Sequence, residues 1–251
     1  RLFDWEDTLR SFRKALDRGA KCAVFTQTSN VFGYLLPVEE MAGECRRRGI
    51  PFIIDAAQSA GAVSIDFEAL GADFIAMPGH KGLLGPMGTG LLLCGRMPRP
   101  LLLGGTGSES ENQAMPDFLP DRGEAGTPNV PGFAGLEAGI RQVLEEGADA
   151  IGRREAALAA YTARELGKLG YEVFAGPHQM GTVSFRGRED CQTLCDRLEP
   201  IALRAGLHCA PLAHRTAGTL DTGTVRVSFC HRANDRQTDI FLRKVRLLRS
   251  G

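Results

Sequence analysis

The sequence predicts an α/β protein whose mostly parallel sheet is followed by a smaller α+β domain. In the first half, short apolar runs alternate with helical patterns, which is typical of parallel strands joined by helices. A connection rich in Gly, Pro, Ser and Asn occupies residues 101–131, and shorter strands mixed with helices follow it. We therefore expect a large domain over residues 1–134, then a linking helix and a small domain over residues 135–251.

The elements of the first half follow from the spacing of apolar residues. A helix is expected at residues 7–18, and a second one begins after Pro37 and ends at Gly49. Strands are expected at residues 22–26, 52–54, 73–77 and 90–93. Ligands of such sheets bind at the carboxyl ends of the strands, and Asp55 and the loop around Lys81 follow two of these ends.

The second half is predicted to combine two long helices with short strands. The helices are expected at residues 135–146 and 151–169. The small domain is expected to contain strands at 171–174, 182–185, 202–204 and 224–228, a helix at 190–198 and a closing helix.

Composition excludes several classes of function. Lys plus Arg equals Asp plus Glu at 30 each, so no overall field attracts nucleic acid or anionic lipid. The apolar runs are too short to span a bilayer, so no membrane partner is expected. The seven cysteines are scattered and odd in number, which favours a reducing cytoplasm over a disulfide framework. Arg46, Arg47 and Arg48 indicate a solvated helix end.

Two short motifs carry the candidate chemistry. Asp55 ends a predicted strand and Gln58 follows three residues later, an arrangement in which a carboxylate can pair with a protonated ring nitrogen. Lys81 lies in a run of glycines between Pro78 and Gly90. Glycines let the backbone approach a bulky group, and a lysine that is partly desolvated there has a lowered pKa and becomes nucleophilic.

These motifs together resemble the class V aminotransferase and cysteine desulfurase family. The family pattern is an Asp-x-x-Gln after a strand followed by a Gly-His-Lys loop, here ending at Lys81. A Ser-Asn-x-x-Gly segment around Asn30 and the segment from Arg122 to Asn129 match it too. The resemblance implies fold type I of the pyridoxal-phosphate (PLP) enzymes. It further implies that Lys81 forms the Schiff base with PLP and that Asp55 pairs with the pyridinium.

The same resemblance implies contacts for three more side chains. Gln58 would contact the phenolic oxygen O3′ of PLP, and His80 would help to hold its phosphate. Asn30 would lie near the phenolic oxygen and the substrate.

A second segment, from Leu203 to Leu212, indicates which reaction is catalysed. It resembles the Arg-x-Gly-x-His-Cys-Ala-x-Pro loop of group II cysteine desulfurases and selenocysteine lyases. The resemblance implies that Cys209 attacks the sulfur of L-cysteine, which leaves L-alanine and a persulfide. Because the thiolate is the nucleophile, Arg204 is expected to help ionise Cys209. Arg226 matches the arginine that binds the substrate carboxylate through two parallel hydrogen bonds.

The resemblance also implies partners. The family forms homodimers, in which Thr106 of the glycine-rich segment after Leu103 would reach the phosphate of the partner's cofactor. A sulfur-carrier protein would collect the persulfide for sulfur metabolism such as iron–sulfur cluster assembly, and L-selenocysteine is an alternative substrate.

The chain departs from the family pattern in three places. Pro78 replaces a Ser or Thr that binds phosphate, and Gly123 replaces a Phe. Relatives also carry roughly a hundred further residues before the point that matches Arg1, a portion of a domain by size. That portion normally supplies a ring-stacking side chain and a phosphate loop, so a truncated N-terminus is expected.

Two other hypotheses remain. The chain could be another class V enzyme, such as an aminotransferase, an epimerase or a selenocysteine lyase. It could also be an inactive fragment that serves as a dimer scaffold or a docking site for a sulfur carrier. A zinc site is not expected, because the spacing of the histidines and cysteines between His208 and His231 lacks the paired form of structural zinc ligands.

Overall fold

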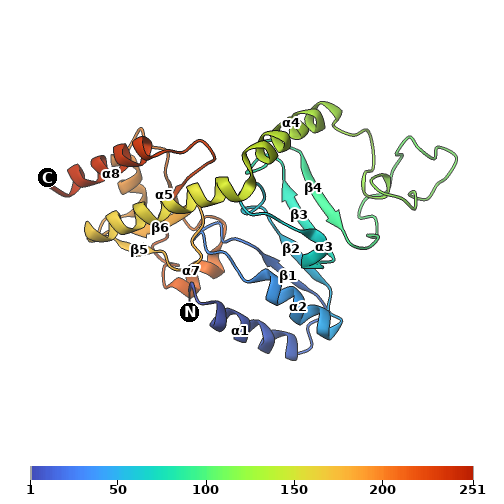
Figure 1. Cartoon of the computed structure of the whole chain (residues 1–251), viewed down its shortest axis with the longest axis horizontal. Helices are drawn as coiled ribbons and strands as arrows, with labels where there is room; N and C mark the ends of the chain where they lie inside the picture. Colours follow the sequence, from blue (N-terminus) through green and yellow to red (C-terminus); the bar gives the residue numbers. More distant parts are fainter. Residues whose placement is uncertain (1, 251) are drawn as a thin grey trace.

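The computed structural model describes residues 2–250, and within them the strands form two four-stranded sheets. Figure 1 shows the two sheets in separate lobes, with helix α4 (Val130–Glu146) along the first and helix α5 (Ala148–Lys168) along the second. The first sheet is mostly parallel and the second is antiparallel. The predicted fold class, an α/β lobe followed by an α+β lobe, is therefore confirmed.

The first sheet has the strand order β1-β2-β3-β4. Its strands are β1 (Ala23–Thr26), β2 (Phe52–Asp55), β3 (Phe74–Pro78) and β4 (Gly90–Cys94). The predicted strands agree with these bounds within one residue at each end. The first three strands are parallel, and the register places Asp55 between Thr26 and Ala76. The carboxyl ends of these strands therefore meet at one edge of the sheet.

Helices α1 (Trp5–Asp17) and α2 (Val38–Arg48) pack on one face of this sheet. Helix α1 begins at Asp4, whose side chain accepts a hydrogen bond from the Asp7 backbone amide. Helix α2 ends at Gly49, which has the positive φ of +63° that ends many helices. The short helix α3 (Phe67–Leu70) was not predicted; it begins at Asp66, which caps the Ala69 amide.

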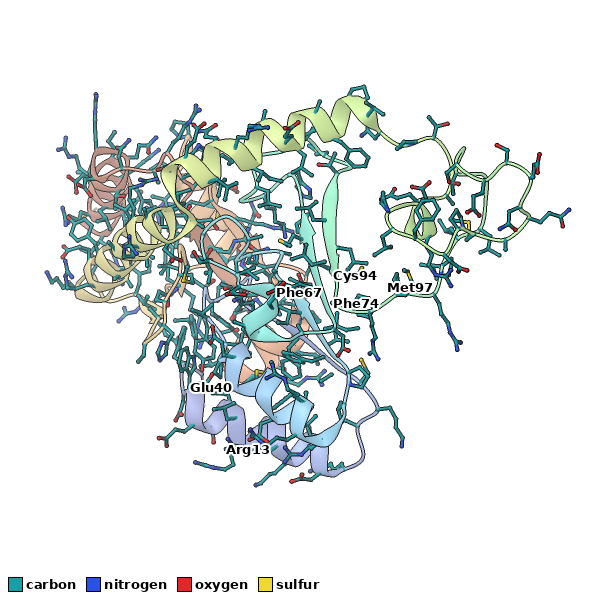
Figure 2. The ribbon with its side chains drawn as sticks, turned by 45° about the vertical axis from the view of Figure 1, so that its right-hand side comes forward. Arg13, Glu40, Phe67, Phe74, Cys94 and Met97 are labelled. Carbon is teal, nitrogen blue, oxygen red and sulfur yellow. The ribbon has the colours of Figure 1, made fainter. Side chains whose placement is uncertain are left out.

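A long irregular connection joins β4 to α4. Figure 2 labels Phe74 and Cys94, which face each other across β3 and β4, and Met97, where the chain leaves the sheet. The connection contains one 3-10 turn, η1 (Asp121–Gly123), and projects away from both lobes in Figure 1. The residues at its start are apolar and exposed: Leu101, Leu102 and Leu103.

The second sheet has the order β5-β6-β8-β7 and packs against α5 and α8. Its strands are β5 (Glu172–Phe174), β6 (Thr182–Arg186), β7 (Arg204–Gly206) and β8 (Thr224–Ser228). Helices α6 (Cys191–Arg197), α7 (Pro211–Ala217) and α8 (Asp235–Ser250) accompany them. Among residues 2–250, no helix combines the length and the apolar character that crossing a bilayer requires.

Three predicted elements of the second half were wrong in detail. The strand predicted at 202–204 lies at Arg204–Gly206, because pairing with β8 sets its position. The segment that forms helix α7 was predicted to be a loop. Helix α4 begins at Val130, since Asn129 caps the Gly132 amide and a proline fits the first turn. The predicted division after residue 134 therefore falls inside α4, and the domain boundary stays a prediction.

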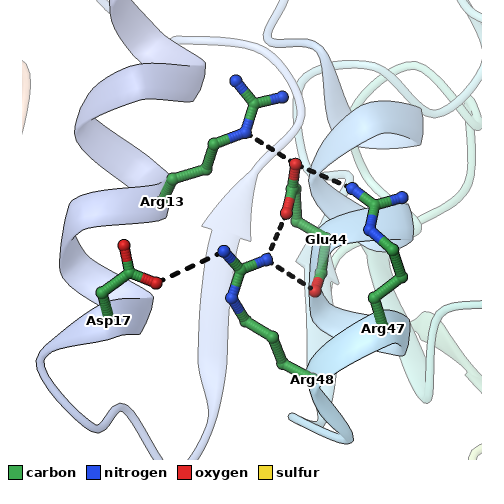
Figure 3. Close-up of polar contacts among 5 residues, drawn as sticks. All are labelled: Arg13, Asp17, Glu44, Arg47 and Arg48. Atoms are coloured by element: carbon green, nitrogen blue, oxygen red, sulfur yellow. Dashed lines mark hydrogen bonds and ion pairs between the residues drawn. The ribbon is translucent and has the colours of Figure 1, made fainter.

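A buried carboxylate joins α1 to α2. Glu44 is 5% exposed and receives Nε of Arg13 at 2.6 Å, Nη2 of Arg47 at 2.7 Å and a close contact from Arg48 (Figure 3). These hydrogen bonds, first that of Arg13, lower the pKa of Glu44 to about 2. The arginines at the end of α2 are exposed, as predicted, and two of them are also partners of this carboxylate.

We expect Glu44→Ala to lower the free energy of unfolding by about 2 kcal/mol, the scale of hydrogen bonds to a charged group. Because the pKa of Glu44 is lowered by folding, its contribution is fully present above pH ~4.3 and is lost as the pH falls toward 2. Urea unfolding at pH 7 and pH 3 measures both effects. Glu40→Ala, on the exposed face of α2 (Figure 2), is the control. An equal loss in both variants would contradict a special role for Glu44.

Candidate active site

The carboxyl edge of the first sheet contains the first group of candidate side chains. Asp55 is the exposed last residue of β2, and its Oδ1 accepts a hydrogen bond of 2.8 Å from the Ala57 amide. Asp55, His80 and Lys81 all line one open cavity of about 630 Å³. The structure thus brings together the acid, the imidazole and the amine that the sequence singled out.

The loop that carries Lys81 is closely packed. The Gly79 amide donates to Thr89 O, and the Gly85 amide donates to Gly79 O, each at 2.8 Å. A Cβ at Gly79 would overlap the hydroxyl of Thr89, so this position requires glycine. Lys81 itself is exposed. The partial desolvation that we expected from the sequence is therefore wrong for this chain, although the lysine does face a cavity.

A second cavity, of about 290 Å³, lies between the two lobes and also includes Lys81. Gln58 lines it, as do Thr28, Glu155 of α5 and His231 after β8. Thr28 is buried, and neither its Oγ1 nor Nε2 of His231 has a hydrogen-bond partner among residues 2–250. Gln58 and Lys81 therefore share this cavity with polar groups that can still accept or donate hydrogen bonds.

Cys209 belongs to a third group, at the edge of the second sheet. Arg204 and Arg226 are opposite each other in the pairing of β7 with β8. Nη2 of Arg204 lies 3.9 Å from Sγ of Cys209. Nη1 of Arg226 donates to the backbone carbonyl of Asn30 at 2.7 Å, and Nδ2 of Asn30 donates to the carbonyl of His208 at 2.7 Å. Direct contacts thus join Arg204 to Cys209 and Arg226 to Asn30, and Asn30 also binds the residue before Cys209.

Burial and charge modify two groups next to Cys209. Arg226 is half-buried, and burial followed by the nearby Arg204 lowers the pKa of its guanidinium. Its Nε is buried and has no partner within the described part of the chain. Burial lowers the pKa of His208 to about 4, so its imidazole is neutral near pH 7. The guanidinium of Arg226 thus has one nitrogen bonded to Asn30 and another without a partner.

The group around Cys209 adjoins the second cavity. Ser228 lines that cavity and stands two positions after Arg226 on β8, so both side chains lie on the same face of the strand. Thr28, also in the cavity wall, is two residues before Asn30. The cavity that contains Lys81 is thus bordered by the two segments that hold Arg226 and Asn30.

Two sequence features lie apart from these groups. Thr106 is in the projecting connection, where its Oγ1 is 2.9 Å from Oγ of Ser108, and it lines neither cavity. Pro78 ends β3 opposite Gly90 and offers no hydroxyl. Within residues 2–250, no three His, Cys, Asp or Glu side chains are grouped closely enough to hold a metal ion.

Sequence reasoning missed three residues of the site. Glu155 and Thr28 line the second cavity, and His208 is the buried residue under the Cys209 loop. His208 could have been predicted from its position directly before Cys209. Nothing in the sequence around Glu155 indicates a site residue, because an acidic residue inside a polar helix is usually solvated.

Glu155 makes the stability of the protein depend on pH. Burial, only partly offset by Arg154, raises the pKa of its carboxyl to about 7. Arg154 itself binds Glu146 at 2.5 Å and the His231 carbonyl. A pKa raised by folding stabilises the protein below about pH 4.3, and this stabilisation is lost as the pH rises through 7.

We therefore expect Glu155→Gln to be more stable than the parent at pH 8 by roughly 2 kcal/mol, and nearly equal to it at pH 4.5. Guanidinium unfolding of both proteins at these two pH values measures the difference. Glu145→Gln, which changes an exposed acid near the end of α4, is the control. A pH-independent difference for Glu155→Gln would contradict the raised pKa.

The comparisons with known proteins agree with one another. Residues 3–241 match the family model of class V aminotransferases. A probable cysteine desulfurase of Xylella fastidiosa is 39% identical over 203 residues, which are 76% of this chain and 48% of that protein. A probable cysteine desulfurase of Pyrococcus abyssi is 36% identical over 84% of this chain and 55% of its own length. The chain thus spans about half the length of the curated relatives it matches.

Solved structures show the same likeness. The apo structure of a cysteine desulfurase from Thermococcus onnurineus superposes with a TM-score of 0.86 at 32% identity, covering 97% of this chain and 63% of that one. The cysteine desulfurase CsdA of Escherichia coli gives a TM-score of 0.81 at 26% identity, with coverage of 94% and 61%.

Proposed function

The chain belongs to the class V aminotransferase family, and from this membership we propose that it is a PLP-dependent cysteine desulfurase. In this proposal L-cysteine is converted to L-alanine, and the sulfur remains on Cys209 as a persulfide. One observation carries the proposal: an arginine nitrogen lies 3.9 Å from Sγ of Cys209, in the same group as the half-buried Arg226. The curated relatives named cysteine desulfurases support it.

The residues at the carboxyl edge of the first sheet fit PLP in three respects. The cofactor needs a primary amine for its aldehyde, an acid for its ring nitrogen and donors for its phosphate. Lys81, Asp55 and His80 line the same cavity and provide one group of each kind. Gln58 is the candidate donor to the phenolic oxygen, and Asn30 is a second polar group near it. When bound, PLP would accept the electrons released when the substrate loses its α-proton.

The side chains of this chain have separate tasks in the proposed reaction. Arg226 binds the substrate carboxylate through guanidinium N–H groups that are not bonded to Asn30. Lys81 takes up the α-proton and returns a proton to carbon. Asp55 would keep a positive charge on the ring nitrogen of bound PLP.

Sulfur transfer is the task of Cys209. Its thiolate forms a sulfur–sulfur bond with the substrate as the Cβ–S bond breaks. The electron pair of the broken bond stays with the carbon skeleton, which leaves as alanine after protonation. Arg204, 3.9 Å from Sγ, stabilises the negative charge of the attacking sulfur.

The proposal extends to partners and compartment. Thr106 and the exposed leucines lie in the projecting connection, which supports contact with a second copy and a role for Thr106 at the partner's phosphate. A sulfur-carrier protein is the proposed acceptor, with iron–sulfur cluster assembly as one use. L-Selenocysteine is the alternative substrate. All seven cysteines are free thiols, which supports a reducing compartment such as the cytoplasm.

The test of the function is product analysis. The protein is incubated with PLP, L-cysteine and a thiol reductant, and alanine and sulfide are quantified together. Equal amounts of both support the desulfurase. Amino-group exchange with a keto acid and no sulfide would identify a class V aminotransferase instead. Absence of both reactions would leave a scaffold role, and alanine from L-selenocysteine alone would identify a selenocysteine lyase.

A further inference from the structure

The loop that carries Cys209 has an unusual backbone. It follows β7 and precedes α7, and both His208 and Cys209 have positive φ, +50° and +60°. Residues with a side chain adopt this left-handed conformation rarely, and at a cost that surrounding contacts must offset. The contacts that hold these two residues therefore determine where the thiol lies.

One set of contacts comes from the second sheet itself. The His208 ring is 3% exposed, and its Nε2 lies 3.1 Å from the Thr224 carbonyl and 3.2 Å from its Oγ1. Since the pKa of this imidazole is lowered to about 4, the ring is neutral and donates Nε2–H to the carbonyl. The ring of His214 packs beside it at 5.7 Å. These contacts fix the side chain of His208 but leave its backbone carbonyl to another partner.

That partner is Asn30, which comes from the loop between β1 and α2, 178 residues away in the sequence. Its side-chain Nδ2 donates to the His208 carbonyl at 2.7 Å. Its own backbone carbonyl accepts Nη1 of Arg226, also at 2.7 Å. A single residue of the first lobe is thus bonded to both the Cys209 loop and the candidate carboxylate-binding arginine.

We propose that Asn30 is a positioning residue that holds the Cys209 loop in its left-handed conformation and ties it to Arg226. This proposal rests on the proposed desulfurase function, because Asn30 would fix the Cys209 thiol relative to Arg226, the group that binds the substrate carboxylate. The amide nitrogen of Asn30 carries the anchor, and its Oδ1 stays free for a cofactor or substrate contact. Without the anchor, the peptide after His208 can leave the strained conformation.

Hydrogen exchange of the cofactor-free protein tests the anchor. In Asn30→Ala, we expect the backbone amide of Ala210, which donates to the Leu207 carbonyl, to exchange about tenfold faster, as loss of one hydrogen bond to a carbonyl predicts. Asn30→Ser, whose hydroxyl is too short to reach the carbonyl, should give the same increase if the alanine variant folds poorly. Asn234→Ala, which removes a local asparagine contact before α8, is the matched control and should leave the exchange of the Ala210 amide unchanged.

Kinetics of the PLP-loaded protein provide the second measurement. Loss of the anchor should lower kcat for sulfide release at least tenfold and change KM for L-cysteine by less than about threefold, because the Asn30 variants keep the backbone carbonyl that holds Arg226. Unchanged exchange in both Asn30 variants would overturn the proposal, whatever happens to activity. Faster exchange in a protein that releases no sulfide from L-cysteine would keep the anchor and refute the desulfurase function.

Discussion

Replacing Lys81 by alanine is expected to abolish the visible absorbance of the protein with PLP and to lower cysteine turnover by at least about 10³-fold. Lys81 is the amine that shares a cavity with both Asp55 and His80, and it also lines the cavity between the lobes. An aldehyde held in the first cavity can therefore condense with this side chain. Loss of the amine removes both the covalent attachment and the group that moves the α-proton.

The measurement is a visible spectrum of each protein after removal of free PLP, followed by the alanine assay. Lys81→Arg keeps the charge but not a primary amine, so it should fail in the same way. Lys21→Ala, an exposed lysine before β1, should behave like the parent protein. Full absorbance in Lys81→Ala would show that another lysine reacts with PLP, and the assignment of the site would be wrong.

Local signals predicted much of the fold. Pro37 and Gly49 bracket α2 because a fixed φ suits a helix start and a positive φ suits its end. The strand predicted at 224–228 is β8, since an apolar β-branched run is buried in the second sheet. Helix α7 was missed because its stability comes from packing: the buried His214 bonds Thr219 at 2.7 Å, a contact that no spacing rule shows.

The site was predictable only where a motif lies in one stretch of sequence. Asp55 ends β2 and the Lys81 loop follows β3, so their shared edge follows from parallel pairing of two recognisable strands. The bond from Asn30 to His208 joins residues 178 positions apart and depends on how the two lobes meet. Glu155 becomes partly buried where α5 packs against Gly181, at which a Cβ would lie 2.7 Å from Oε2 of Glu155. Such contacts arise from tertiary packing alone.

Replacing Cys209 by alanine is expected to lower sulfide release from L-cysteine by at least about 100-fold while leaving the visible absorbance with PLP unchanged. Cys209 is an exposed thiol, and a guanidinium nitrogen of Arg204 lies 3.9 Å from its sulfur. Cys45, Cys191 and Cys195 are buried, and burial raises the pKa of each thiol, to about 11 for Cys45 and Cys195. They are therefore poor nucleophiles near pH 7.

Cys22→Ala is the matched control, because Cys22 is also an exposed thiol but precedes β1 and lines neither cavity. It should retain the parent rate. Mass spectrometry after one turnover without reductant should find a mass increase of about 32 Da, the mass of one sulfur atom, on the Cys209 peptide alone. Cys230 is an exposed thiol in the wall of the second cavity. If the persulfide is found on the Cys230 peptide and Cys209→Ala keeps full activity, Cys230 is the nucleophile instead. Cys209 follows β7, whose last residue pairs with Thr224 at the start of β8, and Arg204 lies beside its sulfur. Cys230, in contrast, follows the carboxyl end of β8. The two outcomes therefore assign the sulfur to opposite ends of one strand.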